Sequence, residues 1–237
     1  MIEIIKNILS KLGLFHIVRK IFNNLLISIR SYFFRKNALK TFSRISKILK
    51  EENIEFFLVF GTLLGAIREK KFIKHDLDID FGVWDSCDFF KLQKIMEKNK
   101  FKLVSQIYLS SNKSIEYQNF KDEVTGVSID FYKFTKKSNE IKYYDFLRDE
   151  KLSYGETIKK YGGLFVYCYH LPNYELTEID FLGFKCKTFK EYNNFLKRCY
   201  GNNYMTPIKN YNYREITLKQ EHIAGVVGIK EKVGSGF

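Results

Sequence analysis

The stretch Asp76-Leu-Asp-Ile-Asp-Phe-Gly82 constrains the fold of this chain more than any other segment. Acidic and apolar residues alternate strictly along it, and the side chains of a β-strand point alternately to its two faces. The pattern therefore predicts a strand with Asp76, Asp78 and Asp80 on one face, while Leu77 and its apolar neighbours point to the core. Aspartates two positions apart on a strand have Cα atoms roughly 6.5–7 Å apart, so their carboxylates can converge on one cation.

Three carboxylates on one strand face repel each other, which raises their pKa values and costs stability unless a counterion is present. Hard oxygen ligands with open positions suit Mg²⁺ or Mn²⁺. The sequence therefore predicts a divalent-metal site with Asp78 and Asp80 as ligands. The alternative is a solvated strand whose acidic residues protect a sheet edge, but this alternative leaves the Gly-Thr turn just upstream unexplained.

Gly61-Thr62 follows the apolar run of residues 55–60, a predicted strand, and opens a predicted helix at 62–68. Glycine lets the backbone approach a ligand closely, and a helix N-terminus offers free N–H groups to a phosphate. Alone, a Gly-Thr pair is typical of a helix cap. Next to an Asp-x-Asp strand it indicates a phosphate-binding turn.

Asp130 lies in Val127-Ser-Ile-Asp-Phe-Tyr132, whose alternation places Asp130 on the same strand face as Ser128 and Tyr132. A carboxylate from a separate strand can complete a metal site or act as general base on an attacking hydroxyl. The alternative is an ordinary exposed aspartate on a half-buried strand.

Basic residues surround the predicted turn. Arg68 ends the predicted helix and is the best candidate to neutralise a diphosphate. Lys70, Lys71 and Lys74 are more typical of a solvated loop. His75 precedes the first aspartate and either contacts substrate or is incidental.

The remaining segments alternate between strand and helix signals. We expect helices at 88–99 and 190–200, the second closed by Gly201, a hairpin of 101–108 with 114–120, and strands at 126–134, near 163–169 and near 181–187. The chain is thus predicted to be α+β, with a mixed sheet flanked by helices. A doubly wound parallel sheet is disfavoured because antiparallel hairpins are prominent.

The basic character is concentrated in the first 50 residues, which hold eleven Lys or Arg and one acid, Glu3, whereas the whole chain has a net charge of +13. Residues 2–34 show helical apolar spacing with a candidate break at Gly13, and 37–50 read as a further helix with Leu39, Phe42, Ile45 and Leu49 on one side. A basic amphipathic helix can lie on an anionic membrane. The alternative is packing against its own domain or a partner.

Three functional classes are disfavoured by the sequence. No run reaches the ~18 apolar residues that a membrane-spanning helix needs, and no signal-peptide pattern is found. The four cysteines lack zinc spacing and are expected to be reduced. Nucleic-acid binding is disfavoured because the basic residues lie on an apolar helix. We expect a cytoplasmic protein, peripheral at the inner face of the cytoplasmic membrane if the basic helix binds lipid.

Four segments together resemble the LicD/fukutin family. They are Phe60-Gly-Thr-Leu-Leu-Gly-Ala-Ile-Arg68, Phe72-Ile-Lys-His-Asp-Leu-Asp-Ile-Asp80, Val127-Ser-Ile-Asp-Phe131 and Leu196-Lys-Arg-Cys-Tyr-Gly-Asn-Asn-Tyr-Met-Thr-Pro207. The family pattern has Pro-Trp where this chain has Lys74-His75, and a middle aspartate where it has Leu77. The first departure affects the expected substrate preference, and the second leaves the metal face intact.

The resemblance implies a nucleotidyltransferase-like fold that moves a phosphorylated group, such as phosphocholine or an alditol phosphate, from a CDP-linked donor to a glycan hydroxyl, releasing CMP. It implies that Asp78, Asp80 and Asp130 hold Mg²⁺ or Mn²⁺ and that Gly61, Thr62, Arg68, Asp76 and His75 contact the donor, with Tyr200, Gly201 and Tyr204 forming the far wall. It divides the chain into a basic helical segment at 1–36, a catalytic domain at 37–212 and a C-terminal helix or tail at 213–237. Transfer of NMP from an NTP and a non-enzymatic assembly role remain as alternatives.

Overall fold

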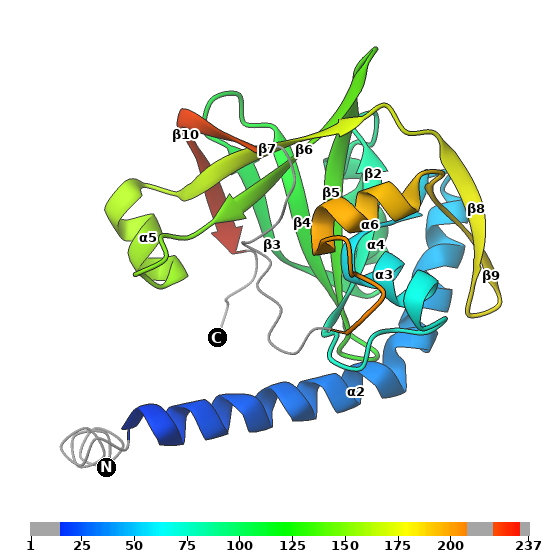
Figure 1. Ribbon diagram of the computed structural model, residues 1–237, viewed down its shortest axis with the longest axis horizontal. Helices are drawn as coiled ribbons and strands as arrows, with labels where there is room; N and C mark the ends of the chain where they lie inside the picture. Colours follow the sequence, from blue (N-terminus) through cyan, green and yellow to red (C-terminus); the bar gives the residue numbers. More distant parts are fainter. Residues whose placement is uncertain (1–14, 208–219, 233–237) are drawn as a thin grey trace.

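The computed structural model describes residues 15–207 and 220–232 and has an α+β fold (Figure 1). The helices are α2 (Phe15–Glu51), α3 (Phe60–Arg68), α4 (Phe89–Lys98), α5 (Tyr154–Tyr161) and α6 (Tyr192–Tyr200). The strands are β1 (Phe56–Leu58), β2 (Asp78–Trp84), β3 (Phe101–Leu109), β4 (Ile115–Asp122), β5 (Ser128–Lys136), β6 (Glu140–Leu147), β7 (Leu164–Pro172), β8 (Leu176–Phe181), β9 (Phe184–Phe189) and β10 (Gln220–Lys232). The predicted fold class is confirmed.

Eight strands form one mixed sheet in the order β1-β2-β5-β4-β3-β10-β7-β6, and β8 and β9 form a separate hairpin. The pairing of β2 with β5 is parallel, whereas the other neighbours are antiparallel. The end of β5 also pairs with β6. The pairings β5-β4-β3-β10-β7-β6 therefore return to β5, so this part of the sheet curves back on itself.

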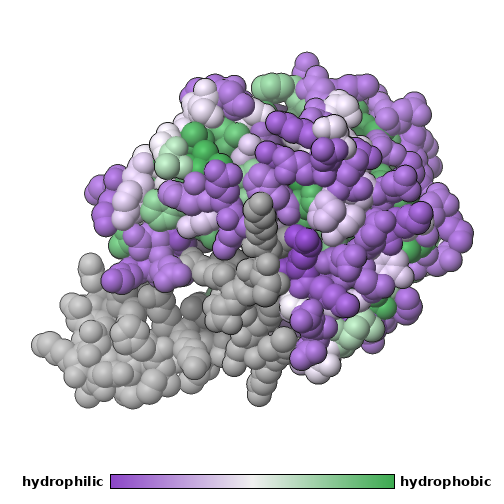
Figure 2. All heavy atoms as spheres, turned by 45° about the horizontal axis from the view of Figure 1, so that its top comes forward, coloured by the Kyte–Doolittle hydropathy of each residue, from purple (hydrophilic) through white to green (hydrophobic). Residues whose placement is uncertain are grey.

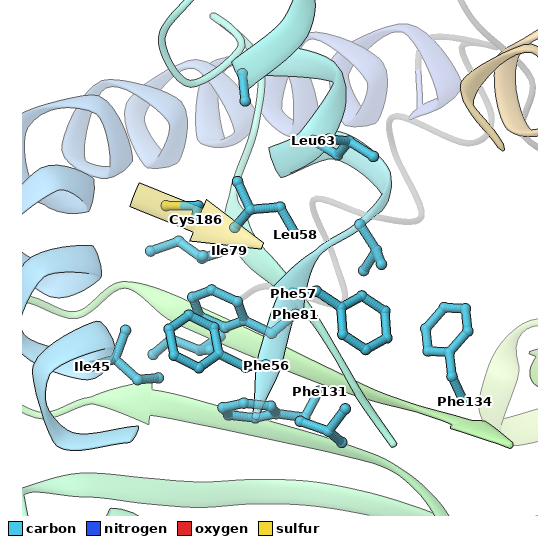
Figure 3. Close-up of a cluster of buried hydrophobic side chains, with 14 of the residues drawn as sticks. Ile45, Phe56, Phe57, Leu58, Leu63, Ile79, Phe81, Phe131, Phe134 and Cys186 are labelled. Carbon is cyan, nitrogen blue, oxygen red and sulfur yellow. The ribbon is translucent and has the colours of Figure 1, made fainter. Parts of the chain in front are cut away.

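The core is built on phenylalanine rings. Phe42 of α2 stacks on Phe81 of β2, which in turn stacks on Phe131 of β5. On the other face of the sheet, Phe57 packs against Phe134 with ring centroids 5.3 Å apart. Aromatic pairs of this kind each contribute about 0.5–1.5 kcal/mol beyond their buried area. Figure 3 shows Phe57, Phe81, Phe131 and Phe134 gathered in one cluster. This packing holds in place the two strands that carry the aspartates.

Gly82 is required by this packing. A Cβ at this position would lie 2.3 Å from the ring of Phe57, which sits directly opposite Gly82 in the β1–β2 register. Only glycine lets β1 approach β2 here.

Residues 37–50 are helical, as predicted, but they are not a separate helix, because α2 runs without interruption from Phe15 to Glu51. No Gly or Pro occurs between Gly13 and Gly61 to end a helix. Leu39, predicted on the buried side, is 49% exposed, while Phe42 and Ile45 are fully buried. The candidate break at Gly13 lies outside the described residues. No described helix has the length and apolarity to span a membrane.

Two other predictions need correction. The acidic strand begins at Asp78, because the Asp76 carboxylate accepts the backbone N–H of Ile73 and holds residues 73–76 in a turn; Leu77 is only half-buried there. The segment 213–237 was predicted as a helix or tail, but residues 220–232 form β10, which inserts between β3 and β7 and satisfies the edges of both.

The other predicted elements hold, with ends shifted by a few residues. The hairpin of β3 with β4 is confirmed, α6 ends at Gly201 in a positive-φ conformation (φ 84), and α3 begins at Phe60, two residues before its predicted start. The four cysteines are unbridged, and Cys168, Cys186 and Cys199 are buried.

Candidate active site

Four aspartates from two strands and the preceding turn gather where α3 begins. Asp80 of β2 lies directly opposite Asp130 of β5 in the parallel register, and both side chains face away from Ile79 and Ile129, which are fully buried in the core. Adjacent strands are ~4.8 Å apart, so the two carboxylates are neighbours. The prediction that Asp130 shares the face of Asp80 is confirmed.

The turn at Gly61-Thr62 is locked to Asp80 by two reciprocal hydrogen bonds. The Thr62 backbone N–H donates to Asp80 Oδ2 (3.3 Å), and the Asp80 backbone N–H donates to Thr62 Oγ1 (2.8 Å). Val59, the residue before α3, provides no side-chain cap, so Asp80 satisfies one of the free N–H groups of the helix. This arrangement explains why a Gly-Thr helix start and an Asp-x-Asp strand occur together.

Gly61 brings the backbone close to two carboxylates. A Cβ at this position would lie 3.1 Å from Asp80 Oδ2 and 3.3 Å from Asp76 Oδ1. The preceding residue, Phe60, has φ 44, a left-handed conformation that is rare for a bulky side chain. Such outliers persist only where surrounding contacts hold them, and the Phe60 ring packs on Tyr132 at 4.8 Å.

Burial and mutual repulsion act on all four carboxyls. Burial raises the pKa of Asp76 to about 7, and Asp78 adds to the effect. Burial is also the main reason that the pKa values of Asp78, Asp80 and Asp130 are raised, and the neighbouring aspartates reinforce it at Asp80 and Asp130. Each ionised group is therefore costly in the absence of a cation.

Two residues that sequence reasoning missed act on Asp130. The Asn119 side-chain amide and the Tyr117 hydroxyl both donate hydrogen bonds to its carboxylate, which opposes the rise in its pKa. Both come from β4, one strand away. The alternation of Tyr117 and Asn119 with the buried residues Gln118 and Phe120 could be recognised in the sequence. The register of β4 with β5, which brings them to Asp130, could not.

Arg68 and His75, also predicted as site residues, differ in how they lie relative to the four aspartates. Arg68 acts electrostatically on Asp76, but its guanidinium donates to the Tyr204 carbonyl (3.3 Å) and to Glu69 (2.8 Å), and its Nε is buried without a partner. His75 is exposed in the turn before β2. Arg68 thus lies near Asp76, while contacts of Arg68 and His75 with a ligand stay predictions.

The segment at the end of α6 meets the site through Arg68. Tyr204 supplies the carbonyl that Arg68 binds, and its own hydroxyl donates to Asn193. Tyr200 is half-buried against the core, and Gly201 ends the helix. The structure thus brings this segment to α3, while a wall role for Tyr200 and Gly201 stays a prediction.

The helix α2 passes beside the turn that leads into β2. Ser31 and Arg35 both donate to the backbone carbonyl of Lys74, and the positive charge of Arg30 acts on Asp78. The long helix therefore fixes the approach to the carboxylates.

The four carboxylates offer oxygen ligands, which suit a hard divalent cation. Within the described ranges, Asp78, Asp80 and Asp130 form no ion pair with a lysine or arginine. Within residues 15–207 and 220–232, no group of three or more His, Cys, Asp or Glu side chains is arranged so that it could hold a metal ion. The predicted metal ligation thus remains a prediction.

Comparison with known proteins decides the family. The family described as LicD/FKTN/FKRP, nucleotidyltransferase domain, matches residues 53–191, more than half of the chain. This chain belongs to the LicD/FKTN/FKRP family. A curated relative, the ribitol-5-phosphate transferase FKTN of Mus musculus, is 24% identical over 187 residues, which cover 76% of this chain. The chain spans only 36% of that relative's length.

The family match includes α3, β2 and β5 and therefore all four aspartates of the site. It leaves out α2, α6, the segment after α6 and the strand β10. The family resemblance inferred from the sequence is thus confirmed for the region that carries the carboxylates.

Proposed function

We propose that this protein transfers a phosphorylated substituent, a phosphocholine or an alditol phosphate, from a CDP-linked donor to a glycan hydroxyl and releases CMP. The observation that carries the proposal is the pairing of Asp80 with Asp130 across two parallel strands, with the Gly61-Thr62 backbone against Asp80. Membership of the LicD/FKTN/FKRP family supports it, as does similarity to a ribitol-5-phosphate transferase.

Asp78, Asp80 and Asp130 would hold Mg²⁺ or Mn²⁺, which when bound would neutralise the charge of the donor diphosphate. The backbone at Gly61 lies against the same carboxylates and orients the diphosphate at the start of α3. The free Nε of Arg68 donates to a phosphate oxygen beside Asp76. Catalysis then consists mainly of positioning and charge neutralisation.

In the transfer step, the acceptor hydroxyl oxygen forms a bond to the phosphorus that carries the substituent. The bond between that phosphorus and the bridging oxygen breaks, and CMP leaves with the bridging oxygen. Where Asp130 acts as the general base and not as a ligand, the hydroxyl proton passes to its carboxylate, which Asn119 holds in place.

The direct test is product identity. Purified protein is incubated with CDP-choline, CDP-ribitol or CDP-glycerol and Mg²⁺ or Mn²⁺, and CMP is quantified for the wild type and for Asp80→Asn. The matched control is Asp85→Asn, an exposed aspartate just after the same strand. We expect CMP from one donor with the wild type and the control, and none with Asp80→Asn.

The competing reaction gives a different product. Release of pyrophosphate from an NTP, with no CMP from any donor, would replace the proposal by nucleotidyl transfer. No turnover in either assay, with no donor-induced thermal shift, would favour a non-enzymatic role.

We also propose that the N-terminal half of α2 binds an anionic membrane surface. In Figure 1 this half projects from the body of the protein. It exposes seven large apolar side chains along one side: Val18, Phe22, Leu25, Leu26, Ile29, Tyr32 and Phe33.

The middle of this outer stripe points away from the buried side of α2. A helix turns by about 100° per residue, so Ile29 points about 140° away from Phe34, which begins the buried stripe that continues through Phe42 and Ile45. No Asp or Glu occurs between Ile4 and Lys50. An apolar stripe on an all-basic helix is complementary to anionic lipid.

The test is co-sedimentation of the full chain with phosphatidylcholine vesicles, with and without phosphatidylglycerol. The triple variant Phe22→Ser, Leu25→Ser, Ile29→Ser should lose binding to the anionic vesicles, while Phe90→Ser, at an equally exposed phenylalanine of α4, should keep it. Equal binding by both variants would contradict the proposal. A dimer that the triple variant dissociates would assign the stripe to a second copy of the chain.

A further inference from the structure

The sheet face that carries the aspartates continues across three further strands. In register, one row of residues crosses from β10 to β2: Lys232, Ser105, Asn119, Asp130 and Asp80. The next row contains Lys230, Ile107, Tyr117 and Tyr132. Since directly paired residues on neighbouring strands share a face, the carboxylates and the lysines of β10 lie on one surface.

This surface has opposite charges at its two ends. Beyond Asp130, the strands β4, β3 and β10 contribute four lysines: Lys121, Lys102, Lys230 and Lys232. Three acidic residues of these strands alternate with the lysines and face the other way, where Glu116 pairs with Lys133, Asp122 with Arg44, and Glu231 with Gln106. A fourth, Glu221 at the start of β10, lies 3.7 Å from His170. The lysine end is therefore not neutralised by acids of its own strands on this face.

Lys230 differs from the other three lysines in its burial. It is half-buried, whereas Lys102, Lys121 and Lys232 are exposed. Its ammonium lies 5.8 Å from the ring centre of Tyr154 on α5, and it makes no ion pair with an acid in the described part of the chain. Burial, reinforced by Lys232, lowers its pKa, while Asp130 opposes this shift. A half-buried cation without a partner is expected to be offset by an anionic ligand.

We propose that Lys230, assisted by Lys232, binds a phosphate group of the substrates at the far end of this face. This inference rests on the proposed phosphotransferase function. Three strand spacings separate β5 from β10, roughly 14 Å along the sheet. The charge of Lys230 still acts on Asp130, so the phosphate at Lys230 is either the part of the donor diphosphate that extends away from the carboxylates or a phosphate of a phosphorylated acceptor.

The test measures binding, so it does not require turnover. Isothermal titration of the full chain with CDP-ribitol forms the donor arm, and titration of the CDP-saturated protein with inorganic phosphate forms the acceptor arm. The variant is Lys230→Met, and the control is Lys185→Met on β9, a lysine already paired with Asp180. Losing one charge-assisted contact should weaken the affected arm about tenfold. The control should leave both arms unchanged.

Each outcome has a distinct meaning. If Lys230→Met binds CDP-ribitol more weakly than the wild type, a donor phosphate lies at Lys230. If it binds inorganic phosphate more weakly, a phosphate of the acceptor lies there. In either case Lys230→Arg should restore the affinity. Equal affinities for wild type and Lys230→Met in both arms would overturn the inference. If the wild type binds inorganic phosphate through Lys230 but neither binds nor turns over CDP compounds, the proposed function fails while this site stands.

Discussion

The two ends of the substrate-facing surface differ in how they are built. At the carboxylate end, Asp78 and Asp80 lie on a single strand, and Asp130 joins them from the adjacent parallel strand. At the lysine end, Lys230 comes from β10, which is remote in sequence and enters the sheet between β3 and β7. The carboxylate end follows from local sequence patterns, whereas the lysine end depends on the order of the strands in the sheet. The variants below are chosen to separate the two ends.

The largest difference is expected in turnover. Asp130→Asn removes a carboxylate that faces Asp80 and that accepts hydrogen bonds from β4, so kcat should fall on the order of 10²–10⁴-fold, the range for loss of a general base. Steady-state CMP release at saturating donor measures it. Lys230→Met should raise the KM of one substrate and leave kcat within a few-fold. If the two variants affect the same parameter equally, the division into a reacting end and a binding end is wrong.

A smaller effect is expected for the residue that positions Asp130. Asn119→Ala removes the amide donor to this carboxylate, and loss of a supporting hydrogen bond at a metal ligand typically costs roughly 10–100-fold in activity or metal affinity. Mn²⁺ titration and kcat should both decline. A variant with unchanged Mn²⁺ affinity and unchanged kcat would show that Asn119 has no positioning role.

Stability should change in the opposite sense to activity at the carboxylate end. In EDTA, Asp80→Asn removes a buried charge that Asp78, Asp130 and Asp76 repel, so the free energy of unfolding should rise by about 1 kcal/mol. Lys230→Met should stay within about 0.5 kcal/mol. Urea denaturation measures both. A clear loss of stability in Asp80→Asn would mean that its bonds to Thr62 outweigh the repulsion.

The smallest effect is expected for the exposed lysines of the same face. Lys121→Met should change donor affinity less than about twofold at physiological salt, because exposed charges are screened by solvent and ions. The comparison with Lys230→Met tests whether burial decides which lysine binds. Equal losses of donor affinity in both variants would mean that the lysines of this face act together as a diffuse electrostatic surface.

The carboxylate end could be predicted because alternation along one strand is a local property. The pattern around Asp80 and Asp130 specified which face each side chain occupies, and Gly61-Thr62 indicated the helix start that contacts them. The start of β2 was misplaced because the turn formed by Asp76 depends on a side chain-to-backbone bond, which periodicity does not reveal.

The rest of the surface required the pairing of strands. Tyr117 and Asn119 were on a predicted strand, but only the β4–β5 register brings them to Asp130. The strand β10 contains Gly225 and Gly228 and lacks strict alternation, so its sequence resembled a tail; a Cβ at Gly228 would lie 2.2 Å from the Phe146 ring, so glycine is needed where the curved sheet packs on itself. The face of the molecule shown in Figure 2 is mostly hydrophilic, with hydrophobic residues scattered across it.

The central claim is that Asp80 and its neighbours hold the cation on which transfer depends. The most direct measurement is Mn²⁺ binding, followed by electron paramagnetic resonance, in the presence of the CDP-linked donor for wild type, Asp80→Asn and Asp85→Asn. The account predicts bound Mn²⁺ in the wild type and in Asp85→Asn, loss of bound Mn²⁺ in Asp80→Asn, and no CMP release in EDTA. Mn²⁺ bound equally by Asp80→Asn, or CMP released at the full rate in EDTA, would contradict it.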